Sequence, residues 1–188
     1  MQKVLNKTDL FHFLGKELKI KTVSPFVSCF KMVEMWARGS ERLPTWTFIY
    51  ALRQYEYYKN QKSSSFLKYI CRHFWRFKFR HLQIKYNLFI EPNVVESGLT
   101  LMHPGYRMIP SFCVIGENCT ILPMVLCGKK RPGIEGKIII GKNCYISTGV
   151  TILGPVNIGD NVTIGAGAVI TKDIPDNVTV AGVPAHII

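Results

Sequence analysis

The sequence predicts a mainly β chain, in which a parallel β-helix of six-residue repeats follows an α-helical N-terminal region. Composition changes near residue 90, because residues 1–90 hold 17 of the 24 Lys and Arg and 19 of the 22 aromatic side chains. We therefore expect two units, residues 1–88 and 89–188. In the second unit isoleucine recurs every six residues on two ladders, at Ile109, Ile115, Ile121, Ile140, Ile146, Ile152, Ile158, Ile164 and Ile170.

Residues 1–88 form a helical, basic and aromatic-rich N-terminal region in this prediction. Pro25 and Pro44 interrupt it, and helices are expected near residues 8–20, 26–37, 45–60 and 64–84. In the last helix one side carries Lys68, Arg72, Arg76 and Arg80, and the other carries Phe66, Ile70, Phe74 and Phe77. Such a helix either packs its apolar stripe on the protein, or binds an anionic membrane surface or a lipid-linked glycan precursor.

The isoleucines of residues 89–188 are expected to point into a narrow, three-sided core, because three flat faces account for a period of six. Asn118, Asn143 and Asn161 are expected to accept the turns at the corners. The fourth residue after each isoleucine is small or β-branched: Cys113, Cys119, Val125, Cys144, Val150, Val156, Val162, Ala168 and Ile174. The cysteines in this position are interpreted as packing residues rather than as catalytic residues or metal ligands.

The repeat is interrupted twice. Ile121 and Ile140 are 19 residues apart, one more than three repeats, and the segment GKKRPGIEGK between them predicts an excursion loop at residues 128–137. Leu101 precedes Ile109 by eight residues, and His103 stands at this break in phase. Because a polar side chain can leave the wall of the β-helix there, His103 is the candidate general base.

The segments GLTLMHPGYRMIPSFCVIGENCTI, GPVNIGDNVTIGAGAVITKDIPDN and AGVPAHII resemble the hexapeptide-repeat acyltransferases. The resemblance covers roughly residues 89–188 and points to the serine acetyltransferase-like group, which includes enzymes that O-acetylate sugars of bacterial surface polysaccharides. It implies a left-handed β-helix, a homotrimer with sites between neighbouring β-helices, acetyl-CoA as co-substrate and His103 as the general base.

The same resemblance implies the donor-binding residues. Thr171 and Lys172 fall near the nucleotide end of coenzyme A, where a cation suits phosphate charges, and His186 stands where the family often has Lys or Arg. The fold also hosts zinc enzymes that need three histidines, and residues 89–188 hold two, so no metal is expected. The positions that contact the donor in sugar acetyltransferases correspond to Thr148, Gly165 and Ala166.

The acceptor is inferred from the positions at which this sequence differs from the serine acetyltransferases. Those enzymes place an acid directly before the histidine, where this chain has Met102, and another acid upstream, where it has Phe89. Their second histidine, which contacts the acceptor, has Glu135 as its nearest counterpart. We therefore expect a sugar hydroxyl in bacterial surface polysaccharide synthesis, with serine O-acetylation as the alternative and a non-catalytic trimeric scaffold or membrane-docking module as a third interpretation. The carboxylates that could orient His103 are Glu91, Glu96 and Glu135.

Partners and location follow from charge and hydropathy. The net charge of +12 is unaccompanied by any nucleic-acid-binding motif, so nucleic acid is not expected as a partner. No run of eighteen apolar residues and no apolar N-terminal run occurs, which predicts a cytoplasmic protein. Residues 64–84 would place it at the inner face of the membrane if that helix binds lipid.

Overall fold

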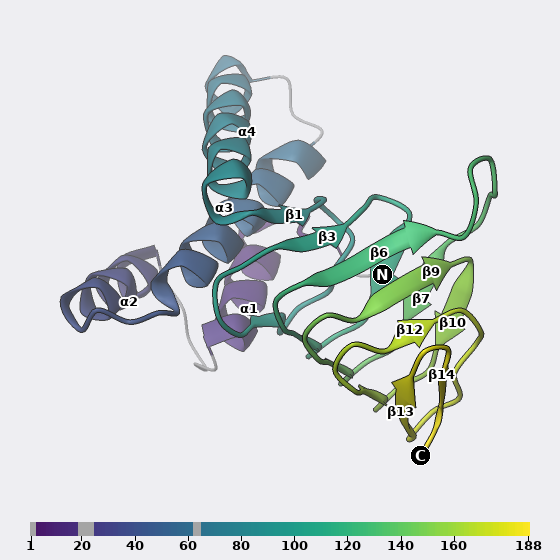
Figure 1. Cartoon of the computed structure of the whole chain (residues 1–188). Helices are drawn as coiled ribbons and strands as arrows, with labels where there is room; N and C mark the ends of the chain where they lie inside the picture. Colours follow the sequence, from purple (N-terminus) through teal and green to yellow (C-terminus); the bar gives the residue numbers. More distant parts are fainter. Residues whose placement is uncertain (1–2, 19–24, 62–64) are drawn as a thin grey trace.

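The computed structural model describes residues 3–18, 25–61 and 65–188 of the chain. Within these residues four helices gather at one end of a β-helix (Figure 1), namely α1 (Lys7–Leu18), α2 (Pro25–Ala37), α3 (Leu43–Asn60) and α4 (Phe66–Tyr86). They confirm the helical prediction, and no helix end differs from the predicted one by more than two residues. The predicted helical residues 19, 20 and 64 lie outside the described residues.

Local sequence explains several helix ends. Asn6 and Asp9 cap α1 reciprocally, because the Asp9 backbone N–H donates to Asn6 Oδ1 at 2.8 Å and the Asn6 N–H donates to Asp9 Oδ2 at 3.2 Å. Pro44 stands in the first turn of α3, where a missing N–H costs no hydrogen bond. Asn87 ends α4 in the left-handed conformation at φ 55°, and the chain enters the first strand at Leu88. None of the described helices has the length and hydropathy to cross a membrane.

The rest of the chain is a left-handed parallel β-helix, as predicted, and its coils supply strands to three sheets. Sheet A has the order β1-β3-β6-β9-β12, sheet B β10-β7-β4, and sheet C β14-β13-β11-β8-β5-β2. Only β14 among the paired strands runs antiparallel to its neighbour. The strands are β1 (Leu88–Ile90), β2 (Thr100–Leu101), β3 (Arg107–Ile109), β4 (Cys113–Ile115), β5 (Thr120–Ile121), β6 (Val125–Lys129), β7 (Ile138–Ile140), β8 (Tyr145–Ile146), β9 (Thr151–Gly154), β10 (Val156–Ile158), β11 (Thr163–Ile164), β12 (Val169–Ile170), β13 (Thr179–Gly182) and β14 (Ala185–Ile187).

The core of the β-helix confirms the inward positions. All nine ladder isoleucines are buried, and so are the small residues four positions later. The thiols of Cys119 and Cys144 each contact a backbone carbonyl oxygen of the next coil at 3.2 Å, at Gly141 and Gly159. These cysteines therefore pack and bond within the core, as the repeat predicts.

Asparagines line the corner between sheets B and C. Asn118, Asn143, Asn161 and Asn177 all have φ between 55° and 60°, a conformation that asparagine tolerates better than most residues. Their side-chain amides bond from coil to coil, with N···O distances of 3.3, 3.0 and 2.8 Å along the column. The prediction of asparagine at the corners is confirmed.

The apolar stripe of α4 faces away from the rest of the chain. The side chains of the predicted stripe are between 47% and 77% exposed. The helix packs instead through Phe79, Leu82, Gln83 and half-buried Trp75. The interpretation that the stripe packs on this chain is therefore wrong. The reason is that α4 packs through its opposite side, where Trp75, Phe79 and Leu82 lie, so the predicted stripe faces outward and the first turns of α4 project in Figure 1.

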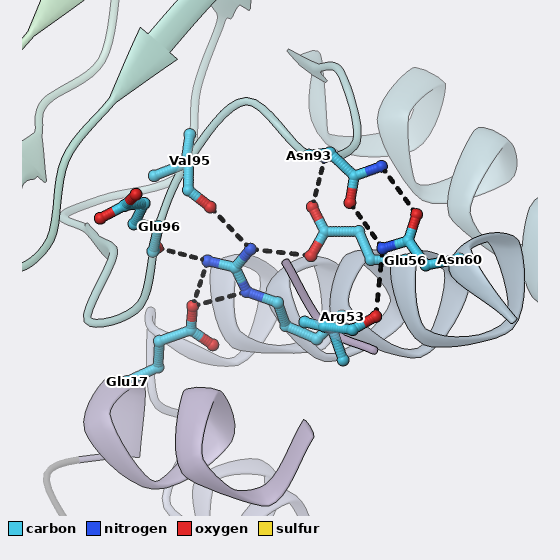
Figure 2. A network of polar contacts seen from close by, with 8 residues as sticks. Glu17, Arg53, Glu56, Asn60, Asn93, Val95 and Glu96 are labelled. Carbon is cyan, nitrogen blue, oxygen red and sulfur yellow. Dashed lines mark hydrogen bonds and ion pairs between the residues drawn. The ribbon is translucent and has the colours of Figure 1, made fainter. Parts of the chain in front are cut away.

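A buried polar network joins the helices to the first coil (Figure 2). Arg53 of α3 donates to Glu17 Oε1 at 2.6 and 2.8 Å, to Glu56 Oε2 at 2.8 Å, and to the carbonyl oxygens of Val95 and Glu96. The side chains of Arg53 and Glu17 have no exposed surface. Because the guanidinium bonds Glu17 of α1 and the carbonyl oxygens of Val95 and Glu96 at the same time, Arg53 fixes α1 and α3 on the start of the β-helix.

Candidate functional site

His103 lies on the edge of the β-helix between sheets C and A. The turn that carries it joins β2 to β3, and His103 itself has φ 57°. Its side chain is 52% exposed, so the break in phase does direct it out of the wall. Nδ1 of the ring lies 3.2 Å from Oε2 of Glu41.

Arg107 holds this turn in place from inside. It occupies the small inward position of its coil, pairs in register with Val125, and is fully buried. Every hydrogen bond of its guanidinium goes to a backbone carbonyl oxygen, those of Met102, His103, Gly105 and Ile121. Burial lowers the pKa of Arg107 to about 10, which leaves it charged at neutral pH.

The role of Arg107 was not predicted from the sequence, although a signal was present. Position 107 precedes a ladder isoleucine by two residues, where other coils carry Cys113, Cys119 or Val150. A cation in that phase indicates that carbonyl oxygens inside the coil lack their usual partners. The two extra residues of the His103 turn supply those carbonyls.

Glu41 was also missed, and no sequence signal could have found it. It lies in the turn between α2 and α3, 62 residues before His103. Only the docking of the helices on the first coils brings the two together. When Nδ1–H of His103 donates to this carboxylate, Nε2 is left unprotonated and able to accept a proton.

The three predicted carboxylates lie elsewhere in the single chain. Glu91 Oε1 is 3.8 Å from Nη1 of Arg80, at the junction of α4 and β1. Glu135 is exposed in the segment between β6 and β7, where β6 extends to Lys129 and shortens the predicted excursion to residues 130–137. The carbonyl oxygen of Glu96 accepts a hydrogen bond from Arg53.

The predicted donor-contacting residues share an edge with His103. The turns of this edge stack through backbone bonds, from the Met124 N–H to the Tyr106 carbonyl oxygen at 2.6 Å and from the Gly167 N–H to that of Thr148 at 2.9 Å. Thr148 and Ala166 are exposed on these turns, and Gly165 begins the last of them. A side chain at Gly167 would meet open space, so the edge offers an unobstructed surface along several coils.

The other donor-end candidates are separated from that edge. Thr171 and Lys172 follow β12, on the edge between sheets A and B, and Lys172 is exposed. His186 lies on β14 opposite Ala181, next to the coil of Gly165. The described residues contain no group of three His, Cys, Asp or Glu side chains placed to hold a metal ion.

Comparisons with known proteins match this architecture. Residues 137–172 match the family described as bacterial transferase hexapeptide (six repeats). The chain is 35% identical over 122 residues to a galactoside O-acetyltransferase of Escherichia coli K12, across 54% of this chain and 60% of that protein. It is 30% identical over 107 residues to a serine acetyltransferase of Synechococcus elongatus, across 46% and 41%. The matched segments thus span about half of these relatives.

Solved structures resemble the chain over nearly its whole length. The serine acetyltransferase of Brucella abortus strain S19 superposes with a TM-score of 0.70 at 24% identity, covering 97% of this chain and 70% of that one. Soybean serine acetyltransferase in complex with serine gives a TM-score of 0.67 at 22% identity, with the same coverage of both chains. The helical region therefore belongs to the shared fold together with the β-helix.

Proposed function

We propose, from the premise that this chain carries the hexapeptide repeats of the bacterial transferase family, that it is an acetyl-CoA-dependent O-acetyltransferase with His103 as its general base. The observation that carries the proposal is the placement of His103. It stands in an exposed break of the coil, paired with a carboxylate, on the edge where the residues implied in donor binding lie.

The geometry supports a simple proton cycle. Glu41 accepts from Nδ1–H of His103, so Nε2 takes the proton of the acceptor hydroxyl as its oxygen attacks the thioester carbonyl carbon. The carbon–sulfur bond then breaks, and His103 returns the proton to the leaving thiolate. The acceptor gains the acetyl group, and the imidazole is neutral again.

Assembly of several subunits is proposed to bring a further carboxylate to the site. We propose a homotrimer, because the outward positions of sheet A form an apolar row of Phe89, Met108 and Leu126 beside the His103 edge. The exposed loop of Glu135 projects from the β-helix, so Glu135 is proposed to approach His103 of a neighbouring subunit. Glu91 remains a second proposed catalytic carboxylate.

The donor is proposed to lie along the edge that His103 shares with Thr148, Gly165 and Ala166. Thr171, Lys172 and His186 are proposed to contact its nucleotide end, where the exposed ammonium group of Lys172 suits phosphate oxygens. These residues supply backbone and hydroxyl contacts and one positive charge.

The acceptor is proposed to be a sugar hydroxyl, within surface polysaccharide synthesis, and serine is the second candidate. Relatives with both activities support acetyl transfer, so a direct assay must separate the acceptors. Purified protein with acetyl-CoA is tested for thiol release with serine and with a panel of sugars and glycosides. Release that depends on a sugar supports the proposal, and release with serine alone contradicts it.

The exposed face of α4 is proposed to contact an anionic membrane, which would place the enzyme at the inner face of the membrane. Phe66, Leu67, Phe74 and Phe77 are between 56% and 77% exposed, and cations interleave with them. Such a face gains both apolar burial and charge attraction at an anionic surface.

Co-sedimentation with vesicles tests this contact. The chain is expected to bind vesicles that contain phosphatidylglycerol and not vesicles of phosphatidylcholine alone. The double substitution Phe74→Ser and Phe77→Ser should abolish binding, whereas Phe30→Ser, at an exposed position of α2, should not. Equal binding of all three proteins would contradict the proposal.

A further inference from the structure

A pocket of about 340 Å³ lies between the helices and the outer face of sheet C. Its wall includes residues of α1, α2 and α3 on one side and Thr100, Thr120 and Tyr145 of three neighbouring strands on the other. This volume falls within the range of about 300–1,000 Å³ that small-molecule sites have. The pocket is large enough for a single sugar ring.

The pocket adjoins the proposed catalytic pair from two directions. Met102 lines it and is followed directly by His103, and Arg42 lines it and follows Glu41. The strand that leads into the His103 turn therefore forms part of its wall. A molecule held there lies next to the groups proposed to deprotonate an acceptor.

Two buried polar atoms of this wall lack partners. Among the described residues, Glu17 Oε2 and Trp46 Nε1 are the buried side-chain polar atoms with no hydrogen bond, and both residues line this pocket. Glu17 directs its other oxygen to Arg53 (Figure 2), and Trp46 is 5% exposed. A buried polar atom without a partner destabilises the folded chain, so a pair of them at one cavity indicates a ligand that supplies the missing hydrogen bonds.

The chemistry of the wall selects the ligand class. The indole N–H can only donate, whereas Glu17 Oε2 accepts when the carboxyl group is ionised and donates when it is protonated. A hydroxyl-bearing ligand suits both atoms, because a hydroxyl group can accept and donate. Glu17 and Glu56 share the cation Arg53, which disfavours an anion beside Glu17. Of the two cations that line the pocket, Lys31 is paired with Glu34 at 2.8 Å and Arg42 is exposed. Met35, Ile49 and Met102 offer apolar surface, and Tyr145 adds a partly exposed aromatic ring.

We infer that this pocket binds a neutral pyranose ring of the acceptor, with one hydroxyl accepting from Trp46 Nε1 and another hydrogen-bonded to Glu17 Oε2. The role of the ring as acceptor rests on the proposed acetyl transfer, whereas the binding of the ring to the pocket does not. Both atoms are shielded from solvent, so the ring reaches them only when neighbouring side chains of the wall move. The ring then presents a further hydroxyl towards His103.

Binding is tested without acetyl-CoA by calorimetric titration of the full chain with methyl β-galactoside and methyl β-glucoside. At least one glycoside should bind, and Trp46→Phe should weaken it about fivefold or more, because the ring is kept and one hydrogen bond is lost. Tyr145→Ala, at a 38% exposed position that tolerates truncation, should also weaken it. Trp36→Phe, on the exposed side of α2 away from the pocket, is the matched control and should bind like the unsubstituted chain.

The outcomes separate this inference from the proposed activity. Absence of glycoside binding, or equal affinity in Trp46→Phe and Tyr145→Ala, overturns the pocket assignment, even if acetyl-CoA is consumed with serine. Glycoside binding with the expected pattern, but no acetylated product when acetyl-CoA is added, keeps the pocket and overturns the acetyl transfer. His103→Ala should retain glycoside binding, because His103 does not line the pocket.

Discussion

Two side chains fix the candidate base from opposite sides. Arg107 binds the carbonyl oxygens of the His103 turn from within the coil, and Glu41 contacts the imidazole from the helical region. The first contact sets the backbone, and the second sets the tautomer. Together they restrain His103 at a site that is otherwise half-exposed.

His103→Ala should lower kcat by about a hundred- to ten-thousandfold, the usual worth of a positioned base, and leave the Kd of acetyl-CoA unchanged. An alcohol is too weak an acid to attack a thioester unaided near neutral pH. Steady-state kinetics with a verified acceptor provide the measurement, with His81→Ala on exposed α4 as the control. Full activity of the His103→Ala variant would mean that a carboxylate, and not His103, is the general base.

Arg107→Lys should lower kcat about tenfold or more while the Kd of acetyl-CoA stays the same. A lysine keeps the charge, but its single ammonium group cannot bond the carbonyl oxygens of Met102, Gly105 and Ile121 together. The His103 turn would then sample other conformations, and small displacements of a catalytic group are costly. Arg72→Lys, at an exposed position of α4 outside the proposed catalytic and donor-binding residues, makes the same change as a control. A parallel loss of donor affinity would indicate general unfolding instead.

At the scale of elements, α1 and α3 share a buried cluster with one more carboxylate than cation. Burial raises the pKa of Glu17 from 4.5 to about 7, against the lowering effect of Arg53, and the negative charge of Glu56 raises it further. The folded state therefore binds a proton on Glu17 between about pH 4.5 and 7 that the unfolded state does not. The contribution of Glu17 to stability is present at the acidic end of this window and is lost as the pH rises through 7.

Glu17→Gln should remove this pH dependence. The free energy of unfolding of the unsubstituted chain should fall between pH 5.5 and 7.5 relative to that of the variant, by up to a few kcal/mol. Urea unfolding at both pH values measures the difference, and the comparison cancels the titration of groups that the two proteins share. If the two curves run parallel, Glu17 is ionised throughout.

The elements also show what a sequence can and cannot predict. The isoleucine ladder and the corner asparagines follow a fixed local period, so their burial and turns were predictable, as was the exposure of His103 at a phase break. Glu41 and the Trp46 pocket depend on how α1, α2 and α3 dock on sheet C, which has no period. The exposed stripe of α4 shows the same limit, because amphipathicity predicts a buried face without naming what buries it.

For the whole molecule, assembly through sheet A is the expectation to test. Met108→Glu should convert a trimer to monomers and abolish activity, because Met108 is 41% exposed at the centre of the apolar row and a buried unpaired charge is costly. Ile139→Glu makes a similar change at a 43% exposed position of sheet B and should leave both properties intact. Analytical ultracentrifugation reports the oligomeric state. A trimer that survives Met108→Glu would move the interface to another face.

A solenoid of parallel coils is in principle open to polymerisation, because its last coil is a template for the next. Here β14 folds back antiparallel on β13 and occupies the free edge of sheet C, while α4 contacts β1 at the opposite end. A second molecule could add end to end only by matching three parallel edges at once, and the reversed strand removes one of them. The hairpin thus leaves sheet C without a parallel free edge at this end, which disfavours the stacking of molecules along the β-helix axis.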